Sequence, residues 1–364
     1  MEKVGILTFH RAINYGAALQ CYCLYKVLCS LGYDVSVVDY RPNYIEHYRL
    51  PFSNYEFRKR KGFLSKLKYL IGVFSKFRLK MSNNKEFDNF FKDIKFVSVK
   101  QNQIVDGSSF NAFIIGSDQV WCPRITDGID PFFWGTLLPN DVRLVSYAAS
   151  MGPITETIKS YKNVMVEKLT KFSSISMREG YAAEYMRNIT GAHVTTVVDP
   201  TLLANREILE KITNNVPEKD YVLYYTLKEE SGMFEFAKDI AKQLGCKVVR
   251  VKPFVKHGDT NDCINISGVG PQEFCSYIKH ARCIVCKSFH GTIISSIFNK
   301  DFYSFSSSKE DRAEAFLRSI GLENRLVCPG EKRKFEPVDF SVANNQMHGL
   351  QMKSLAYLKT ALAR

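Results

Sequence analysis

A histidine lies where a short apolar strand is expected to turn into a helix. The stretch KSFHGTIISS, residues 287–296, directly follows the apolar run CIVC. Amides at a helix start carry the positive end of the helix dipole and attract anions. This dipole and Lys287 both disfavour the charged form of His290, whereas a bound phosphate or carboxylate would favour it, as acid catalysis requires. The alternative is structural: Ser288 only caps the helix and His290 packs on the sheet.

Other polar side chains also follow apolar runs. Arg178 comes after SSISM and could hold a carboxylate or phosphate through two hydrogen bonds, unless it pairs with Glu179. Asp118, in the turn GSDQVW, could act as a base or hold sugar hydroxyls, or only shape the turn. Asp199 precedes a proline, and we expect it to shape a strand exit. His10, in the first loop, ranks second among the histidines.

The candidates fall into three groups. His290 and Asp118 are the catalytic candidates. The candidates for holding a carboxylate or phosphate are Arg178, Lys287, Ser288 and Gly291, the last because a glycine lets a ligand approach the backbone. The candidates for further ligand contacts are Asn14, Tyr15, Gly16 and Gln119.

Several common kinds of site are not expected. The first loop, HRAINYGA, has one glycine instead of the three of a dinucleotide fingerprint, and no phosphate-binding P-loop motif occurs. The pair Cys283 and Cys286 has no second pair or histidine at ligand spacing, so we predict no metal site. The ten cysteines are scattered, as in a reduced cytosolic protein. We expect neither a signal peptide nor a membrane-spanning helix.

Apolar runs of strand and helix type alternate along the chain, which predicts an α/β protein with parallel strands. At 364 residues, two domains are expected. We predict two Rossmann-like domains that face a cleft, and this cleft is the expected ligand site. The predicted boundaries are an N-terminal domain over 1–203, a linker over 204–220, a C-terminal domain over 221–340, and a final helix over 341–364 that could pack back on the N-terminal domain.

Basic residues exceed acidic ones, and the formal net charge is +13. Such a charge favours anionic partners: phosphorylated substrates, an acidic membrane surface or nucleic acid. Residues 49–80 contain one acidic residue, Glu56, and many basic ones. From Phe63 onward, apolar residues recur at helical spacing with lysines between them, which predicts a basic amphipathic helix. Its apolar face could pack on its own domain, or the helix could contact an anionic membrane.

Six stretches together resemble the polysaccharide pyruvyl transferase family, in the order expected for it. They are NYGAALQCYCLYKVL, FIIGSDQVW, YAASMG, SMRE, VVDPTLL and SFHGTIISS. The resemblance implies a GT-B-like pair of Rossmann domains. One position departs from the family pattern: Ser288 stands where many members have an arginine, and Lys287 could supply the charge instead.

The resemblance also implies a reaction. Such enzymes transfer pyruvate from phosphoenolpyruvate to two hydroxyls of a sugar and form a cyclic ketal in capsular, exopolysaccharide or cell-wall glycans. The implied partners are phosphoenolpyruvate and a sugar or lipid-linked oligosaccharide, such as a galactose or N-acetylhexosamine unit. In this reaction the second group of candidates above would hold the donor, phosphoenolpyruvate, and the third group would hold the acceptor. We expect no cofactor, no metal and no nucleic acid, and a cytoplasmic enzyme with peripheral contact at the inner face of the membrane. The alternative is a GT-B glycosyltransferase that uses a nucleotide sugar.

Overall fold

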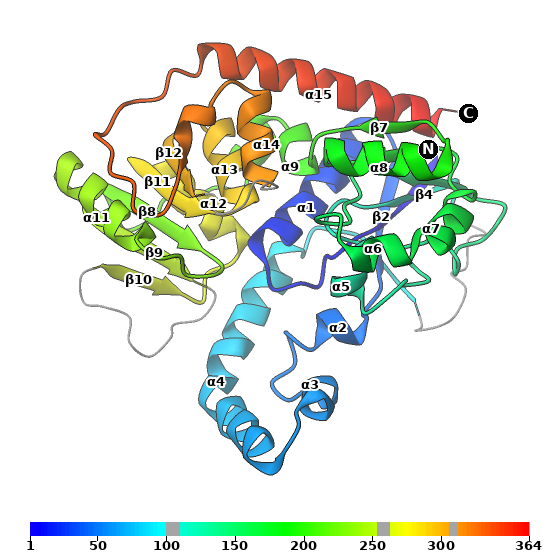
Figure 1. The fold of residues 1–364 in the computed structure, drawn as a ribbon, viewed down its shortest axis with the longest axis horizontal. Coiled ribbons are helices and arrows are strands. Elements are labelled where there is room, and N and C mark those ends of the chain that lie inside the picture. The colour runs from blue at the N-terminus through cyan, green and yellow to red at the C-terminus, as the bar shows by residue number, and fades with distance from the viewer. Residues whose placement is uncertain (100–109, 253–262, 306–311, 364) are drawn as a thin grey trace. The chain divides into compact units, whose positions relative to one another are not determined.

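The structure, a computed structural model, describes residues 1–99, 110–252, 263–305 and 312–363 (Figure 1). The chain divides into two compact units. The first unit consists of Met1–Asn84, Phe91–Leu203 and Leu350–Arg364, and the second of Lys85–Phe90 and Ala204–Gly349. The chain therefore leaves the first unit, builds the second, and returns to the first.

A parallel sheet of five strands, in the order β3-β2-β1-β4-β5, forms the centre of the first unit. Val4 of the middle strand lies opposite Val35 on one side and Ala112 on the other. Apart from the edge strand β3, which is partly exposed, these strands are short and mostly buried on both faces, as parallel strands covered by helices must be. Their bounds are β1 (Lys3–Leu7), β2 (Asp34–Asp39), β3 (Phe96–Ser98), β4 (Ala112–Ile115) and β5 (Arg143–Ser146).

A second, two-stranded parallel sheet of β6 (Ile175–Met177) and β7 (Val194–Thr196) completes the strands of this unit in the described residues. Both tryptophans, Trp121 and Trp134, are fully buried in its core and stack with ring centroids 4.9 Å apart. The helices here are α1 (Tyr15–Ser30), α2 (Asn43–Glu46), α3 (Asn54–Lys59), α5 (Pro123–Thr126), α6 (Glu156–Ser160), α7 (Lys162–Leu169), α8 (Gly180–Thr190) and α9 (Pro200–Leu203).

The second unit contains a parallel six-stranded sheet in the order β10-β9-β8-β11-β12-β13. Its strands are β8 (Tyr221–Thr226), β9 (Lys247–Lys252), β10 (Ile264–Ser267), β11 (Cys283–Lys287), β12 (Asp301–Phe305) and β13 (Leu326–Val327). Its helices are α10 (Arg206–Glu210), α11 (Met233–Leu244), α12 (Pro271–His280), α13 (Phe289–Ile297), α14 (Arg312–Ser319) and the 3₁₀ turn Glu323–Arg325. The prediction of an α/β fold with parallel sheets is confirmed.

Two further helices have residues in both units: α4 (Phe63–Phe90) and α15 (Ser341–Leu362). The last turns of α15 pack on the first unit through four hydrogen bonds. Tyr357 OH donates to Ser146 O at 2.9 Å, and Ser354 Oγ accepts from Val198 N at 3.0 Å. Gln351 and Leu362 make the other two, to Leu202 and Arg143. These bonds hold the end of the chain against strands formed much earlier in the sequence.

The stretch 204–220, expected to be a linker, is grouped with the second unit and includes α10. Asn214 N donates to Ser276 Oγ at 2.9 Å, and Tyr277 OH donates to Glu218 Oε2 at 2.7 Å. Both partners lie on α12. This stretch is therefore attached to the second unit along much of its length.

One helix boundary differs from the sequence prediction. The stretch 10–17, expected to be a polar loop, ends at Asn14, because the Asn14 side chain caps α1 and the helix begins at Tyr15. Elsewhere in this unit, Tyr161 separates α6 from α7.

Candidate functional site

In the first unit, the candidate residues gather at the carboxyl ends of β1 and β4. These two strands are neighbours, and the chain order reverses direction between them. In open α/β sheets, ligands bind at such a switch point. Thr8 Oγ1 donates to Ser117 O at 2.9 Å and accepts from Gln20 Nε2 at 2.9 Å. The loop after β1, helix α1 and the turn after β4 are thus bonded together.

Arg178, which follows β6, lies among three carboxylates. Its Nε donates to Glu179 Oε1 at 3.0 Å and its Nη1 to Asp199 Oδ2 at 2.8 Å, while Nη2 lies 4.0 Å from Asp118 Oδ1. Burial alone would lower the pKa of Arg178, but the charges of Glu179, Asp199 and Asp118 raise it above its usual value. The guanidinium therefore stays charged and fixes the geometry of the turn.

The structure shows the structural alternative for Arg178 and the expected structural role of Asp199, while donor binding by Arg178 stays a prediction. Arg178 makes the ion pair with Glu179 that was its structural alternative. Asp199 shapes the start of α9 by accepting from Thr201 N at 2.9 Å, and it also binds Arg178 and Ser117 Oγ. The pairing of Arg178 with Asp199 links residues 21 positions apart, and nothing in the sequence spacing indicates it.

Asp118 is the most exposed carboxylate of the three. Its side chain is 16% exposed, against 4% for Glu179 and 0% for Asp199. It has a left-handed backbone with φ 73°, which aspartate tolerates, and its Oδ1 accepts from Gln119 N at 2.8 Å. Among the carboxylates of this cluster, Asp118 is the one that a ligand could reach.

The four acceptor candidates divide between capping and packing. Asn14 accepts from Ala17 N at 3.1 Å as the cap of α1. Tyr15 and Gly16 are buried in the first turn, and Tyr15 is fully buried, so its ring packs in the core. Gln119 is half-buried, and its side chain packs against Gly152. A Cβ added to Gly152 would lie only 2.7 Å from Gln119 Nε2. Acceptor contact by these residues stays a prediction.

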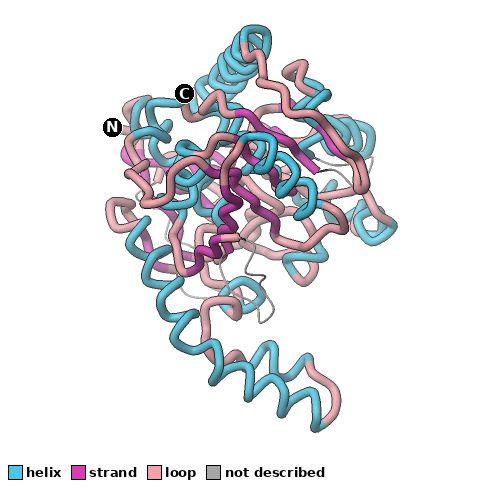
Figure 2. The backbone as a smooth tube through the Cα atoms, turned by 90° about the vertical axis from the view of Figure 1, so that its left-hand side faces the viewer, coloured by secondary structure: helices cyan, strands magenta, loops and turns pink. Residues whose placement is uncertain are grey.

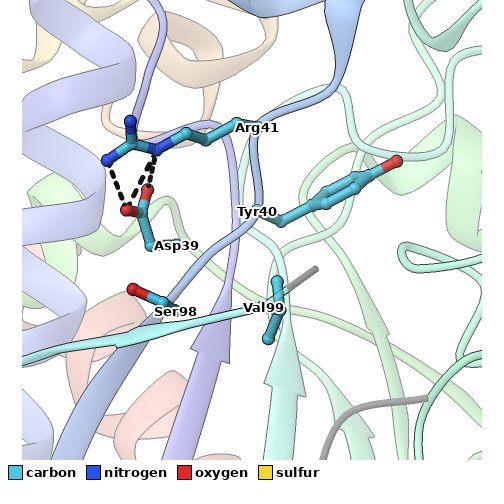
Figure 3. Close-up of a pocket in the computed structure, with 5 residues that line it drawn as sticks. All are labelled: Asp39, Tyr40, Arg41, Ser98 and Val99. Carbon is cyan, nitrogen blue, oxygen red and sulfur yellow. Dashed lines mark hydrogen bonds and ion pairs between the residues drawn. The ribbon is translucent and has the colours of Figure 1, made fainter. Parts of the chain in front are cut away.

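A second polar group follows β2. Asp39 Oδ1 lies 3.0 Å from Nε2 of His10, which is buried, and Arg41 bonds both Asp39 oxygens. Figure 3 shows this arginine against the carboxylate, beside Ser98 and with Val99 nearby. With Tyr40, these four residues line a pocket of about 390 Å³.

Electrostatics stabilise Asp39 as an anion. Burial would raise the pKa of Asp39, but the hydrogen bonds and charges of His10 and Arg41 lower it well below its usual value. The sequence singled out His10 but gave no sign that it meets Asp39.

In the second unit, the switch point lies between β8 and β11. His290 is in the first turn of α13 after β11, buried, with its ring 5.2 Å from Phe289. Ser288 caps α13 by accepting from Gly291 N at 3.2 Å. A Cβ on Gly291 would lie 3.3 Å from both Cys286 Sγ and Ser288 Cβ, so this glycine permits close packing of the helix on its strand. The cap predicted for Ser288 is present.

Lys287, the candidate for the missing arginine charge, forms an ion pair with Glu230. Both side chains are mostly buried, at 23% and 22% exposed. Glu230 follows β8, so this pair joins the two strand ends of the switch point. A donor bound by Lys287 would have to compete with Glu230.

Two basic residues on β9, Arg250 and Lys252, were not predicted as site residues from the sequence. Lys252 Nζ lies 3.2 Å from Glu229 Oε1, and Arg250 Nη2 lies 3.7 Å from the same oxygen. The Arg250 guanidinium also covers the rings of Tyr224 and Phe234, at 4.9 and 4.6 Å. The order β9-β8-β11 places Arg250 and Lys252 toward the same end of the sheet as Lys287, where the parallel strands have their carboxyl ends. The alternating basic residues of VVRVK were the only available signal.

The family model for polysaccharide pyruvyl transferases matches residues 14–309. The chain belongs to this family. The match includes every candidate position from Asn14 to Gly291 in both units. Membership in this transferase family supports a role in polysaccharide pyruvylation generally. The comparison with curated proteins gives no match.

Solved structures show the fold that this pyruvyl transferase family member shares. A protein described as a UDP-N-acetylglucosamine 2-epimerase from Listeria monocytogenes is 10% identical, with a TM-score of 0.53 over 99% of this chain and 90% of that one. The UDP-GlcNAc 2-epimerase from Neisseria meningitidis is also 10% identical, with a TM-score of 0.52 over 99% and 94%. These neighbours have the GT-B fold, as predicted for this chain. At this identity the likeness concerns the fold alone.

Two absences within the described residues bear on metals and membranes. No three His, Cys, Asp or Glu side chains of this part are grouped so that they could hold a metal ion. Within the same residues, no helix combines the length and the apolar character needed to cross a bilayer.

Proposed function

We propose that this pyruvyl transferase family member moves pyruvate from phosphoenolpyruvate to two hydroxyls of one sugar and forms a pyruvate ketal. The match of the family model over residues 14–309 carries this proposal. The geometry supports it, since each unit places polar residues of the family motifs at the switch point of its sheet.

The reaction needs an acid, a base and cationic contacts. Protonation of the methylene carbon of phosphoenolpyruvate gives a cation at the neighbouring carbon, which one sugar hydroxyl attacks. The C–O bond to phosphate then breaks, and the second hydroxyl attacks the same carbon. The two sugar hydroxyls lose one proton each. One proton replaces the proton that turned the methylene group into a methyl group, and the other leaves on hydrogen phosphate. This scheme requires no cofactor and no metal.

In this proposal His290 supplies the proton and Asp118 accepts the hydroxyl protons. His290 suits the acid because it lies in the first turn of a nine-residue helix, where a bound anion is stabilised. Asp118 suits the base because it is the most exposed carboxylate beside Arg178. The donor would be held by Arg178, Lys287, Ser288 and Gly291, and the acceptor by Asn14, Tyr15, Gly16 and Gln119.

The direct test is release of phosphate from phosphoenolpyruvate in the presence and absence of a sugar acceptor. We expect acceptor-dependent release that His290→Ala lowers by at least about 100-fold, the usual scale of general acid catalysis. His348→Ala, on an exposed histidine, is the control and should leave the rate unchanged. Undiminished turnover in His290→Ala would contradict the assigned acid.

A nucleotide-sugar glycosyltransferase remains the second candidate, because the Neisseria meningitidis structure of the same fold is described as bound to UDP-GlcNAc. Thermal shift with phosphoenolpyruvate, UDP and GDP separates the two. Stabilisation by phosphoenolpyruvate supports the ketal reaction, and stabilisation by a nucleotide alone supports the glycosyltransferase.

The proposed setting is the biosynthesis of capsular, exopolysaccharide or cell-wall glycans. The acceptor would be a lipid-linked or glycan sugar, such as a galactose or N-acetylhexosamine unit, met at the inner face of the cytoplasmic membrane. Mass spectrometry of products from a small panel of such acceptors tests this part.

A further inference from the structure

Helix α4 exposes a row of large apolar side chains that no step of the proposed reaction uses. Two of its phenylalanines, Phe63 and Phe74, are 79% and 82% exposed. We call the whole row the apolar stripe; it consists of Phe63, Leu64, Leu67, Ile71, Phe74, Phe77 and Met81. Exposed apolar rows of this size mark interaction surfaces.

The stripe occupies one face of the helix. Six of its members follow one another at steps of three or four residues, which returns each side chain to the same side of an α-helix. The sequence left open whether this face packs on its own domain. The exposure of the stripe shows that it does not.

Other side chains of α4 attach it to the segment before it. Tyr69 OH accepts from Ser53 N at 2.8 Å, and its ring lies 6.2 Å from that of Phe57. Lys80 Nζ donates to Leu50 O at 3.0 Å. Figures 1 and 2 show α3 and the first turns of α4 extending away from the five-stranded sheet of the first unit. The stripe is thus held in place while its surface stays open.

The surroundings of the stripe are strongly basic. Residues 57–84 contain no acidic residue. Exposed basic side chains lie before the stripe, at Lys61, and along it, at Lys68 and Arg78. The basic residues of this segment are Arg58, Lys59, Arg60, Lys61, Lys66, Lys68, Lys76, Arg78 and Lys80.

We propose that α4 lies on an anionic lipid bilayer, with the apolar stripe inserted at the boundary between headgroups and acyl chains. Phenylalanine and leucine on one face, together with many basic residues, are what an interfacial helix requires. The basic residues attract anionic headgroups, and the stripe then leaves water. Insertion is shallow, because only one face of α4 carries the stripe and basic side chains lie beside it.

The charge argues against a second copy of this chain as the occupant. In a dimer formed through the stripe, residues 57–84 of the two copies would lie close together. These segments carry basic and no acidic residues, so their charges would repel each other. An anionic surface reverses the sign of this interaction.

The experiment is flotation of the full chain with vesicles of phosphatidylcholine alone or with about a third phosphatidylglycerol. We expect binding to the anionic vesicles only. The triple variant Lys61→Glu, Lys68→Glu, Arg78→Glu should weaken it by roughly 100-fold or more, at the usual contribution of each basic residue near such a surface. The stripe variant Ile71→Asn, Phe74→Ser should weaken it at least about tenfold, because it removes inserted apolar area.

The controls change the same charge, or one exposed apolar side chain, elsewhere. Lys162→Glu, Lys353→Glu, Lys359→Glu alters three exposed lysines on α7 and α15, and Val342→Asn alters a residue that is 61% exposed. Both should float like the unchanged protein. Equal flotation of the stripe variant, or a charge control as weak as the triple variant, would overturn the proposal.

Sedimentation separates the remaining occupants. A dimer that the stripe variant converts to monomer, without vesicle binding by the parent, would assign the stripe to self-association and overturn the lipid assignment.

The consequence for turnover rests on the proposed function. With a lipid-linked acceptor in vesicles, the stripe variant should lose activity in proportion to its binding. With a short water-soluble acceptor it should keep full activity. Absence of activity in every form with normal flotation would reject the proposed reaction and leave the lipid surface standing.

Discussion

At the scale of single residues, the cluster around Arg178 separates a structural carboxylate from an accessible one. Asp199 is fully buried and bonded to Arg178 at 2.8 Å, whereas Asp118 is partly exposed at 4.0 Å. Removal of one partner from a buried ion pair leaves an uncompensated charge, while a longer and more exposed contact contributes little.

Matched substitutions test this division. Asp199→Asn should lower the free energy of unfolding by about 3 kcal/mol. Asp118→Asn, which suits the same left-handed turn, should lower it by less than about 1 kcal/mol but abolish most turnover. Urea unfolding followed by tryptophan fluorescence measures the first unit directly, since both tryptophans lie in its core. Equal destabilisation by the two changes would contradict the assignment.

Asp39 should give a pH-dependent contribution to stability. Its folded pKa is lowered by His10 and Arg41, so its stabilisation is complete above the unfolded value of about 4 and is lost as the pH falls through the folded value. Asp39→Asn should therefore cost about 2 kcal/mol at pH 7 and about 1 kcal/mol less at pH 3, about one pH unit below the unfolded pKa. Urea titrations of both proteins at the two pH values check this. A constant difference between them would show that the carboxylate charge is not responsible.

At the scale of elements, Asn14 caps helix α1 and is also a candidate for binding the acceptor. Its side chain closes the first turn of α1, and replacement of such a cap by alanine costs about 1 kcal/mol. Asn14→Ala should show this loss, and Asn14→Ser should restore it because serine also caps. If Asn14 also binds the acceptor, the serine variant will keep its stability and show a raised KM for the acceptor alone. Thermal unfolding and acceptor titration together distinguish the roles.

The elements also show what the sequence could predict. Apolar runs that alternate between strand and helix patterns sufficed for the parallel α/β fold, and Ser288 was recognisable as a cap because helix starts have local signals. Contacts between distant residues had no such signal: Arg178 with Asp199, His10 with Asp39 and Lys287 with Glu230 depend on how strands align in the sheet. For the same reason, the sequence could find the amphipathic pattern of α4 but not whether its apolar face is covered.

At the scale of the whole molecule, the first unit depends on residues from the far end of the chain. Removal of residues 350–364 takes away the four hydrogen bonds of α15 and uncovers the apolar side chains beneath it. We expect this truncation to unfold the first unit at temperatures where the full chain is stable. Tyr357→Phe, which loses one bond to Ser146, should cost only about 1 kcal/mol. Tryptophan fluorescence during heating compares the three proteins, and an unchanged transition in the truncated chain would contradict this dependence.

The return of the chain to its first unit has a consequence for synthesis on the ribosome. A domain commonly folds as soon as its residues have emerged, the amino-terminal one first. Here the first sheet emerges early but lacks its last helix until the entire second unit has been made. During that interval Ser146 and Val198 lack their partners Tyr357 and Ser354 on α15, so the first unit completes these hydrogen bonds only after the second unit has been synthesised.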